Sequence, residues 1–272
     1  MKVNKTRPNN RNVIKMTAIA ALLIAVAAGG LFGYGELRRL YIEQCEIVDV
    51  DSQVSITSGK MVRPENIAEF FGLRNGANLA EIDFERKRTD ILSKMPTLRR
   101  VNVLRQLPDK VKIIAEERSP MARMNFVGNR NSTGKVVDED GMVFICHRGS
   151  QTLPTIRESK AASTDPGHFV EGKVFSALQL LKACRNAEFM ELGIQDIDTS
   201  KTDYLVATLG NYSKLKIAWD GMKSAPTPAS TGDLFMRLRN LIKAIHSRIG
   251  SNAITWNATM PDMIFADTQG RQ

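Results

Sequence analysis

The sequence predicts an α+β protein with a single N-terminal transmembrane helix, a small β-α-α-β-β domain and a larger mixed α/β domain that ends in edge strands. Three observations predict this organisation. Residues 16–35 form an uncharged run, residues 96–120 alternate apolar and polar side chains around a proline turn, and strand patterns after residue 122 are interleaved with two amphipathic helices. A period of two residues is typical of half-buried strands, and a period near 3.6 of amphipathic helices.

The uncharged run is long enough to cross a membrane. Its 20 residues are rich in Ala, Leu and Ile, and a helix of that length spans roughly 30 Å, the thickness of a bilayer core. Residues 1–15 carry five Lys and Arg residues and no acid. The positive-inside rule therefore predicts a cytoplasmic basic tail at 1–15, an anchor at 16–35 and all later residues outside.

A cleaved signal peptide is the alternative interpretation of the same segment. Ala25-Val26-Ala27 fits an A-x-A cleavage site, which would release the chain after Ala27. Apolar residues continue beyond it through Leu31, Phe32 and Tyr34, which favours an anchor. Both interpretations export the bulk of the chain.

Small residues recur every four positions along the predicted anchor. Such a stripe lets two membrane helices approach closely, although Ala-rich spans also produce it by chance. The residues predicted to pack there are Ala21, Ala25, Gly29 and Gly33.

The first folded domain is predicted over residues 45–121. Apolar residues at two-residue spacing in 45–57 predict one or two strands. Pro64 fits the first turn of a helix, and Asp83 fits the N-cap of a second helix over 84–95.

A hairpin closes this domain. Val101 and Val103 alternate with a polar residue before the turn, and Val111, Ile113 and Ala115 alternate with polar residues after it. Between the two strands, Leu107-Pro108-Asp109 suits a turn because proline fixes φ and lacks an N–H.

Glycine, proline and charged residues stand at fixed positions around these elements. In order they are Gly76, Asn78, Pro96, Arg105, Pro108, Glu117, Arg118 and Pro120. With this set the domain resembles the POTRA domain of the FtsQ/DivIB family of bacterial division proteins. Thr97 and Leu107 stand where that family often has Trp. The residues of this motif are expected to have structural roles.

The second domain, the β domain of that family, is predicted over 122–267, before a short polar tail at 268–272. A hairpin is expected at 135–146 with its turn at Asp140-Gly141. The further expected elements are a loop at 157–172, a helix at 174–191, strands near 194–198, 203–209 and 212–219, a loop at 220–232, a helix around 234–245, and strands at 253–259 and 263–267.

Composition and spacing do not indicate catalysis, a metal site or a cofactor. The sequence has no Gly-x-Ser-x-Gly elbow, and its three histidines lie far apart. Cys45, Cys146 and Cys184 form an odd set without metal-ligand spacing. The net charge of +9 owes much to the N-terminal tail, so neither nucleic-acid binding nor a small-molecule substrate is expected.

The family resemblance implies a non-enzymatic scaffold of the division machinery at the septum, in the inner membrane, that binds FtsB/FtsL-like partners by strand addition. It places the partner strand against the last strand of the β domain. The residues expected to bind there are Asp262, Met263, Ile264, Phe265 and Ala266. Two alternatives stay open: an exported envelope-assembly or transport-related POTRA protein, and a cleaved exported enzyme.

Overall fold

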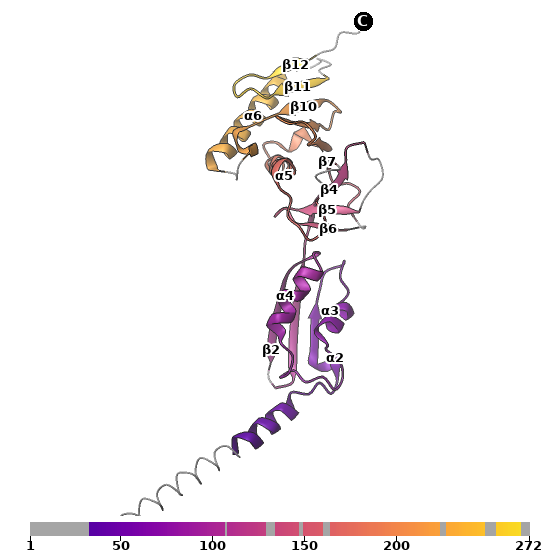
Figure 1. Cartoon of the computed structure of the whole chain (residues 1–272). Coiled ribbons are helices and arrows are strands. Elements are labelled where there is room, and N and C mark those ends of the chain that lie inside the picture. The colour runs from indigo at the N-terminus through magenta and orange to yellow at the C-terminus, as the bar shows by residue number, and fades with distance from the viewer. Residues whose placement is uncertain are drawn as a thin grey trace, which may run out of the picture. The chain divides into compact units, whose positions relative to one another are not determined.

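The computed structural model describes residues 33–106, 108–128, 134–146, 149–159, 164–223, 227–247 and 254–267. These residues divide into two compact units, whose elements are labelled in Figure 1. The first unit draws on residues 1–57, 64–87 and 102–114, and the second on 58–63, 88–101 and 115–272. The domain boundaries expected from the sequence stay a prediction.

Most of the expected membrane anchor lies outside the described residues. The basic tail and three members of the small-residue stripe, Ala21, Ala25 and Gly29, are also outside them. Gly33 opens the described part, in a helix that covers residues 33–44. Within the ranges described, no helix has both the length and the apolar character that a membrane span requires.

A three-stranded sheet lies between residues 54 and 117. Its strand order is β1-β3-β2, and β1 runs parallel to β3 with Val54 opposite Val111. The elements are α2 (Val50–Gln53), β1 (Val54–Thr57), α3 (Pro64–Phe71), α4 (Phe84–Lys94), β2 (Leu98–Gln106) and β3 (Lys110–Glu117). Apart from the short α2, this is the β-α-α-β-β order that the sequence predicts.

The two expected helices are confirmed. Pro64 is the first residue of α3, and the next residue after this helix, Gly72, has a φ of +72°, which is typical of a helix C-terminus. The backbone N–H of Arg86 donates to Asp83 Oδ1 at 3.0 Å, so Asp83 caps α4. In the core of the first unit, the rings of Phe71 and Phe84 stack with 5.9 Å between their centroids.

The segment 45–57 holds one strand, β1, which agrees with the expected one or two. A buried side chain explains why residues 48 and 49 form no second strand, because Gln53 Oε1 accepts hydrogen bonds from the N–H groups of Val48 at 2.7 Å and Asp49 at 2.8 Å. Those N–H groups are therefore not available to a strand ladder. Val48 is 76% exposed, so the apolar spacing at this residue did not indicate a core position.

The predicted hairpin is present as β2 and β3. Val101, Val111, Ile113 and Ala115 are buried, as the alternation predicts, and Pro108 lies in the turn between the strands. The hairpin ends at Glu117, and Pro120 begins the next strand, β4 (Pro120–Phe126).

A nine-stranded sheet forms the second unit. Its order is β12-β11-β10-β9-β8-β7-β4-β5-β6, with parallel pairing of β4 with β7, β7 with β8, and β10 with β11. The further strands are β5 (Lys135–Asp138), β6 (Val143–Ile145), β7 (Thr155–Glu158), β8 (Asp196–Asp198), β9 (Leu205–Thr208), β10 (Lys214–Ile217), β11 (Thr255–Ala258) and β12 (Phe265–Asp267).

Two helices pack on this sheet and close its core. They are α5 (Gly172–Cys184) and α6 (Pro228–Ser247). Leu178 and Leu238 are fully buried and belong to the same apolar cluster as Ile197 and Leu215 of the strands. A short 3-10 helix, η2 (Met190–Leu192), follows α5, and another, η3 (Asp220–Lys223), precedes α6.

The hairpin at 135–146 and the five later strands are confirmed. Two helix bounds were wrong, because α5 ends at Cys184 and not near 191, and α6 begins at Pro228 inside the expected loop. Strands β4 and β7 were not predicted. Proline suits the first helical position because the N–H that it lacks has no intrahelical partner there.

Candidate protein-binding edge

The last strand of the chain's described part, β12, lies at one end of the nine-stranded sheet. It pairs antiparallel with β11, with Phe265 opposite Asn257 and Ala266 opposite Trp256. No other described strand lies on its far side. An edge strand of this kind leaves a row of backbone N–H and C=O groups without sheet partners.

The side chains before and within β12 alternate between core and solvent. Ile264 and Ala266 are partly buried and pack against the core cluster, while Met263 is 56% and Phe265 50% exposed. The edge therefore presents two large apolar side chains next to its backbone groups. Asp262, the fifth residue expected at the site, is exposed and precedes the strand.

The opposite end of the sheet is covered by the chain itself. In β6, Val143 donates its N–H to the carbonyl of His168 at 3.0 Å and accepts from the N–H of Gly167 at 2.8 Å. Met142 also forms an isolated bridge with Phe169. This cover was not predicted from the sequence, where the apolar pair Phe169-Val170 in an otherwise polar loop is the signal that indicates it.

Two neighbouring motif residues, Glu117 and Arg118, bind backbone of the second unit. The Glu117 carboxylate accepts hydrogen bonds from the N–H groups of Lys60 at 2.9 Å, Met61 at 2.9 Å and Val62 at 2.7 Å. A Cβ atom on Gly59 would lie 2.1 Å from this carboxylate. Glycine at position 59 therefore leaves room for the carboxylate to reach the three N–H groups.

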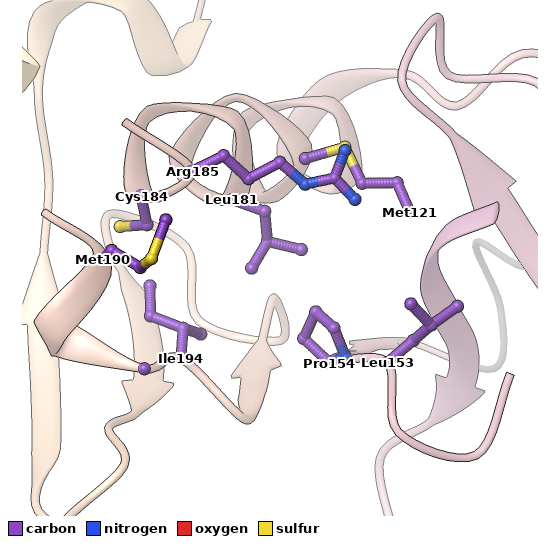
Figure 2. Close-up of a pocket in the computed structure, with 9 residues that line it drawn as sticks. Met121, Leu153, Pro154, Leu181, Cys184, Arg185, Met190 and Ile194 are labelled. Atoms are coloured by element: carbon purple, nitrogen blue, oxygen red, sulfur yellow. The ribbon is translucent and has the colours of Figure 1, made fainter. Parts of the chain in front are cut away.

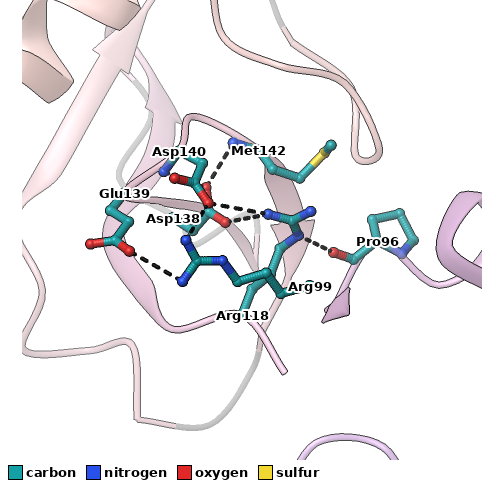
Figure 3. A network of polar contacts seen from close by, with 7 residues as sticks. All are labelled: Pro96, Arg99, Arg118, Asp138, Glu139, Asp140 and Met142. Atoms are coloured by element: carbon teal, nitrogen blue, oxygen red, sulfur yellow. Dashed lines mark hydrogen bonds and ion pairs between the residues drawn. The ribbon is translucent and has the colours of Figure 1, made fainter. Parts of the chain in front are cut away.

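Arg118 lies at the centre of the polar network in Figure 3. Its Nη1 is 2.6 Å from Asp138 Oδ2, and its Nε donates to the carbonyl of Pro96 at 3.1 Å. The other oxygen of Asp138 accepts from the N–H groups of Asp140 and Met142 at 3.0 and 2.8 Å, and so orders the turn between β5 and β6.

Arg99 extends the network toward solvent. Its guanidinium is 2.9 Å from Asp140 and 3.3 Å from Glu139. The pKa of Arg99 is raised, chiefly by the charge of Asp140. Because these side chains are well exposed, their ion pairs contribute little to stability.

Of the remaining motif residues, Pro96 and Pro120 lie in the second unit, where Pro120 begins β4, and the others lie in the first unit. Asn78 Nδ2 donates to the carbonyl of Ile42 at 2.8 Å, and Gly76 has a φ of +81°. Arg105 donates to the carbonyl of Leu79 at 2.8 Å, with its guanidinium 5.3 Å from the ring centroid of Phe84. The structure thus separates the motif into two groups, each bound to backbone in its own unit.

The second unit also holds a small, mostly apolar cavity of about 160 Å³. Figure 2 shows Cys184, the last residue of α5, beside Met190 and Ile194, while the side chain of Arg185 extends toward Met121. Burial raises the pKa of the Cys184 thiol to about 12, so this thiol stays protonated and is a poor nucleophile. The cavity is lined by Met121, Leu153, Pro154, Leu181, Cys184, Arg185, Met190, Gly193 and Ile194.

Cys45, Cys146 and Cys184 form no disulfide with one another, and Cys45 and Cys146 are buried. Within the described ranges, no three His, Cys, Asp or Glu side chains are grouped so that they could hold a metal ion.

Two comparisons with known proteins bear on this chain. Residues 51–118 match the family described as POTRA domain, FtsQ-type. The cell division protein FtsQ of Streptomyces collinus is 27% identical over 137 residues, which are 49% of this chain and 46% of that protein. The aligned part thus spans about half the length of this relative.

Proposed function

The chain belongs to the FtsQ/DivIB family of bacterial cell division proteins, and from this premise we propose that it is a non-enzymatic scaffold of the division machinery. In this proposal it is a single-pass inner-membrane protein with its N-terminus in the cytoplasm. Its two folded domains stand outside the membrane at the septum, where it links early and late division proteins and regulates septal peptidoglycan synthesis.

The observation that carries the mechanism is the difference between the two ends of the nine-stranded sheet. Residues 167–170 cover β6, whereas β12 has no described strand on its outer side. A partner segment that adds a strand to β12 would satisfy its outer N–H and C=O groups, and exposed side chains would select the partner. Met263 and Phe265 are the exposed apolar side chains at this edge.

The partners in this proposal are FtsB/FtsL-like membrane proteins. A segment just outside the membrane in such a protein would supply the added strand. The anchor at 16–35 would keep the scaffold and its partner at the same membrane, and Ala21, Ala25, Gly29 and Gly33 would let a partner helix approach closely within the bilayer.

Depletion of the protein in growing cells tests the proposed role. We expect long, smooth cells with regularly spaced nucleoids, because septation stops while growth and replication continue. Cells of normal length, or cells that lyse with envelope defects, would contradict the division role and favour an envelope-assembly protein. Re-expression of the full chain is the control and should restore normal length.

A further inference from the structure

The helix at residues 33–44 has an apolar face that the first unit does not cover. Tyr34 is 68% exposed, Leu37 69%, Leu40 54% and Tyr41 42%. At 100° per residue, these four side chains fall within an arc of about 120°. They therefore form one continuous apolar face.

The opposite face of this helix is charged. Arg39 and Glu43 lie there and are exposed, and Arg39 Nε is 3.1 Å from Glu43 Oε1. A helix with one apolar and one charged face is typical of a segment that lies at a boundary between an apolar phase and water.

Among the described residues, the hydrogen bonds that tie this helix to the rest of the first unit lie near its C-terminal end. The carbonyl of Ile42 accepts from Asn78 Nδ2 at 2.8 Å and from the N–H of Cys45 at 3.0 Å. Cys45, just after the helix, is buried. Its carbonyl accepts a hydrogen bond from the N–H of Leu79 at 2.9 Å. The apolar face precedes these contacts.

We propose that this apolar face lies in the lipid–water interface on the outer side of the membrane. The inference rests on the proposed anchor at residues 16–35. Leu37 and Leu40 lie two and five residues beyond the end of that run, so a continuous helix places them about 3 and about 7.5 Å farther along the axis. The headgroup layer of a bilayer is roughly 5–8 Å thick on each side, so both residues fall within it, and Tyr41, at about 9 Å, reaches its outer edge.

The side-chain types fit this layer. Tyrosine rings are enriched at membrane interfaces, where one end of the ring is apolar and the hydroxyl is wet. Arg38 borders the apolar face, and a long arginine side chain can reach the phosphates from such a position. Glu36 borders the apolar face on the side away from Arg38. The helix tilts so that Leu37 and Leu40 face the lipid, while Arg39 and Glu43 face water. The first unit is thereby held close to the membrane surface.

Photocrosslinking of the full chain in phospholipid vesicles tests the proposal. One variant carries p-benzoylphenylalanine in place of Leu37, and a matched variant carries it in place of Glu43 on the charged face. Both positions are exposed in the structure, so both variants should fold. We expect severalfold more phospholipid adduct, measured by mass spectrometry of the modified peptide, at position 37 than at position 43.

A third variant, with the probe at Leu23 inside the predicted anchor, separates two kinds of failure. Lipid adduct at Leu23 with none at Leu37 would overturn the interfacial face and leave the anchor intact. Absence of lipid adduct at both would overturn the anchor as well. Adduct at Leu37 with a second copy of the chain, or in cells with another protein, would show that a helix covers this face and would also overturn the proposal.

Discussion

Arg118 and Asp138 form an ion pair that holds two separate segments of the second unit together. The guanidinium Nη1 and the carboxylate Oδ2 are 2.6 Å apart, and both side chains are largely buried, at 12% and 3% exposure. Each partner also binds backbone, Arg118 at Pro96 and Asp138 at the turn before β6. Loss of either charge would leave the other buried without its partner.

Arg118→Ala should therefore destabilise the second unit strongly. We expect the free energy of unfolding to fall by roughly 3 kcal/mol, because removal of one partner leaves an uncompensated buried carboxylate. Both tryptophans of the chain, Trp219 and Trp256, lie in the second unit, so urea unfolding followed by tryptophan fluorescence reports on it. Arg100→Ala, at an exposed residue of β2, is the control and should stay within about 0.5 kcal/mol of the wild type. Equal stability of the two variants would contradict the role of Arg118.

Glu117→Gln should loosen the segment 58–63. The two oxygens of the carboxylate accept from the backbone N–H groups of Lys60, Met61 and Val62. The glutamine side chain has only one acceptor oxygen, and its NH2 group would face these N–H donors without an acceptor between them. We expect a loss of roughly 1–3 kcal/mol and faster hydrogen exchange at these three amides. Glu116→Gln is a matched control because Glu116 is the exposed neighbour in the same strand. Unchanged exchange in Glu117→Gln would exclude the anchoring role.

The Cys184 thiol should react slowly in the folded protein. Burial raises its pKa from 9.0 to about 12, so at pH 8 very little thiolate is present. Alkylation with iodoacetamide, quantified for the Cys184 peptide by mass spectrometry, should be much slower in the native protein than in urea. Equal rates in the two states would contradict a buried thiol.

The raised pKa of Cys184 also predicts a loss of stability at high pH. Between pH 9 and about 12 the folded state keeps a proton that the unfolded state has released, so the free energy of unfolding decreases as the pH rises through this window. A Cys184→Ala variant lacks this group and should lose less stability over the same range. Parallel curves for the two proteins would show that Cys184 does not contribute.

Elements with a clear period were predictable from the sequence. The alternation of Val111, Ile113 and Ala115 gave β3, and Pro64 and Asp83 gave the helix starts, because local geometry alone decides these features. Strands β4 and β7 were not predictable in this way. Each has a neighbouring strand along both of its edges. A strand inside a sheet whose two faces are both buried loses the polar–apolar alternation that marks a half-buried strand.

The partners of the motif residues could not be read from the sequence. Glu117 binds backbone 55 to 57 residues away, and Arg118 pairs with Asp138 across 20 residues. No local pattern encodes such pairings, because they depend on how the chain folds back on itself. The use of β12 as an edge, in contrast, was expected from the family resemblance, and the structure puts this strand at the end of the sheet.

The proposed binding edge can be tested with a side chain that does not support the core. Phe265 is 50% exposed, whereas Ile264 packs against the core cluster, so a change at Ile264 would mix binding with folding. Phe265→Asp places a charge where the partner strand would pack. We expect capture of FtsB/FtsL-like proteins by the full chain to fall at least about tenfold, since buried aromatic residues at the centre of an interface commonly contribute 2 kcal/mol or more.

Tyr212→Asp is the matched control for this prediction. Tyr212 is 77% exposed and lies in the turn between β9 and β10, away from the sheet edge. Both variants should unfold at nearly the wild-type urea concentration, because exposed substitutions usually change stability by less than about 0.5 kcal/mol. Selective loss of capture in Phe265→Asp would assign partner binding to β12. Wild-type capture by a folded Phe265→Asp variant, or equal loss in both variants, would place the partner elsewhere on the chain.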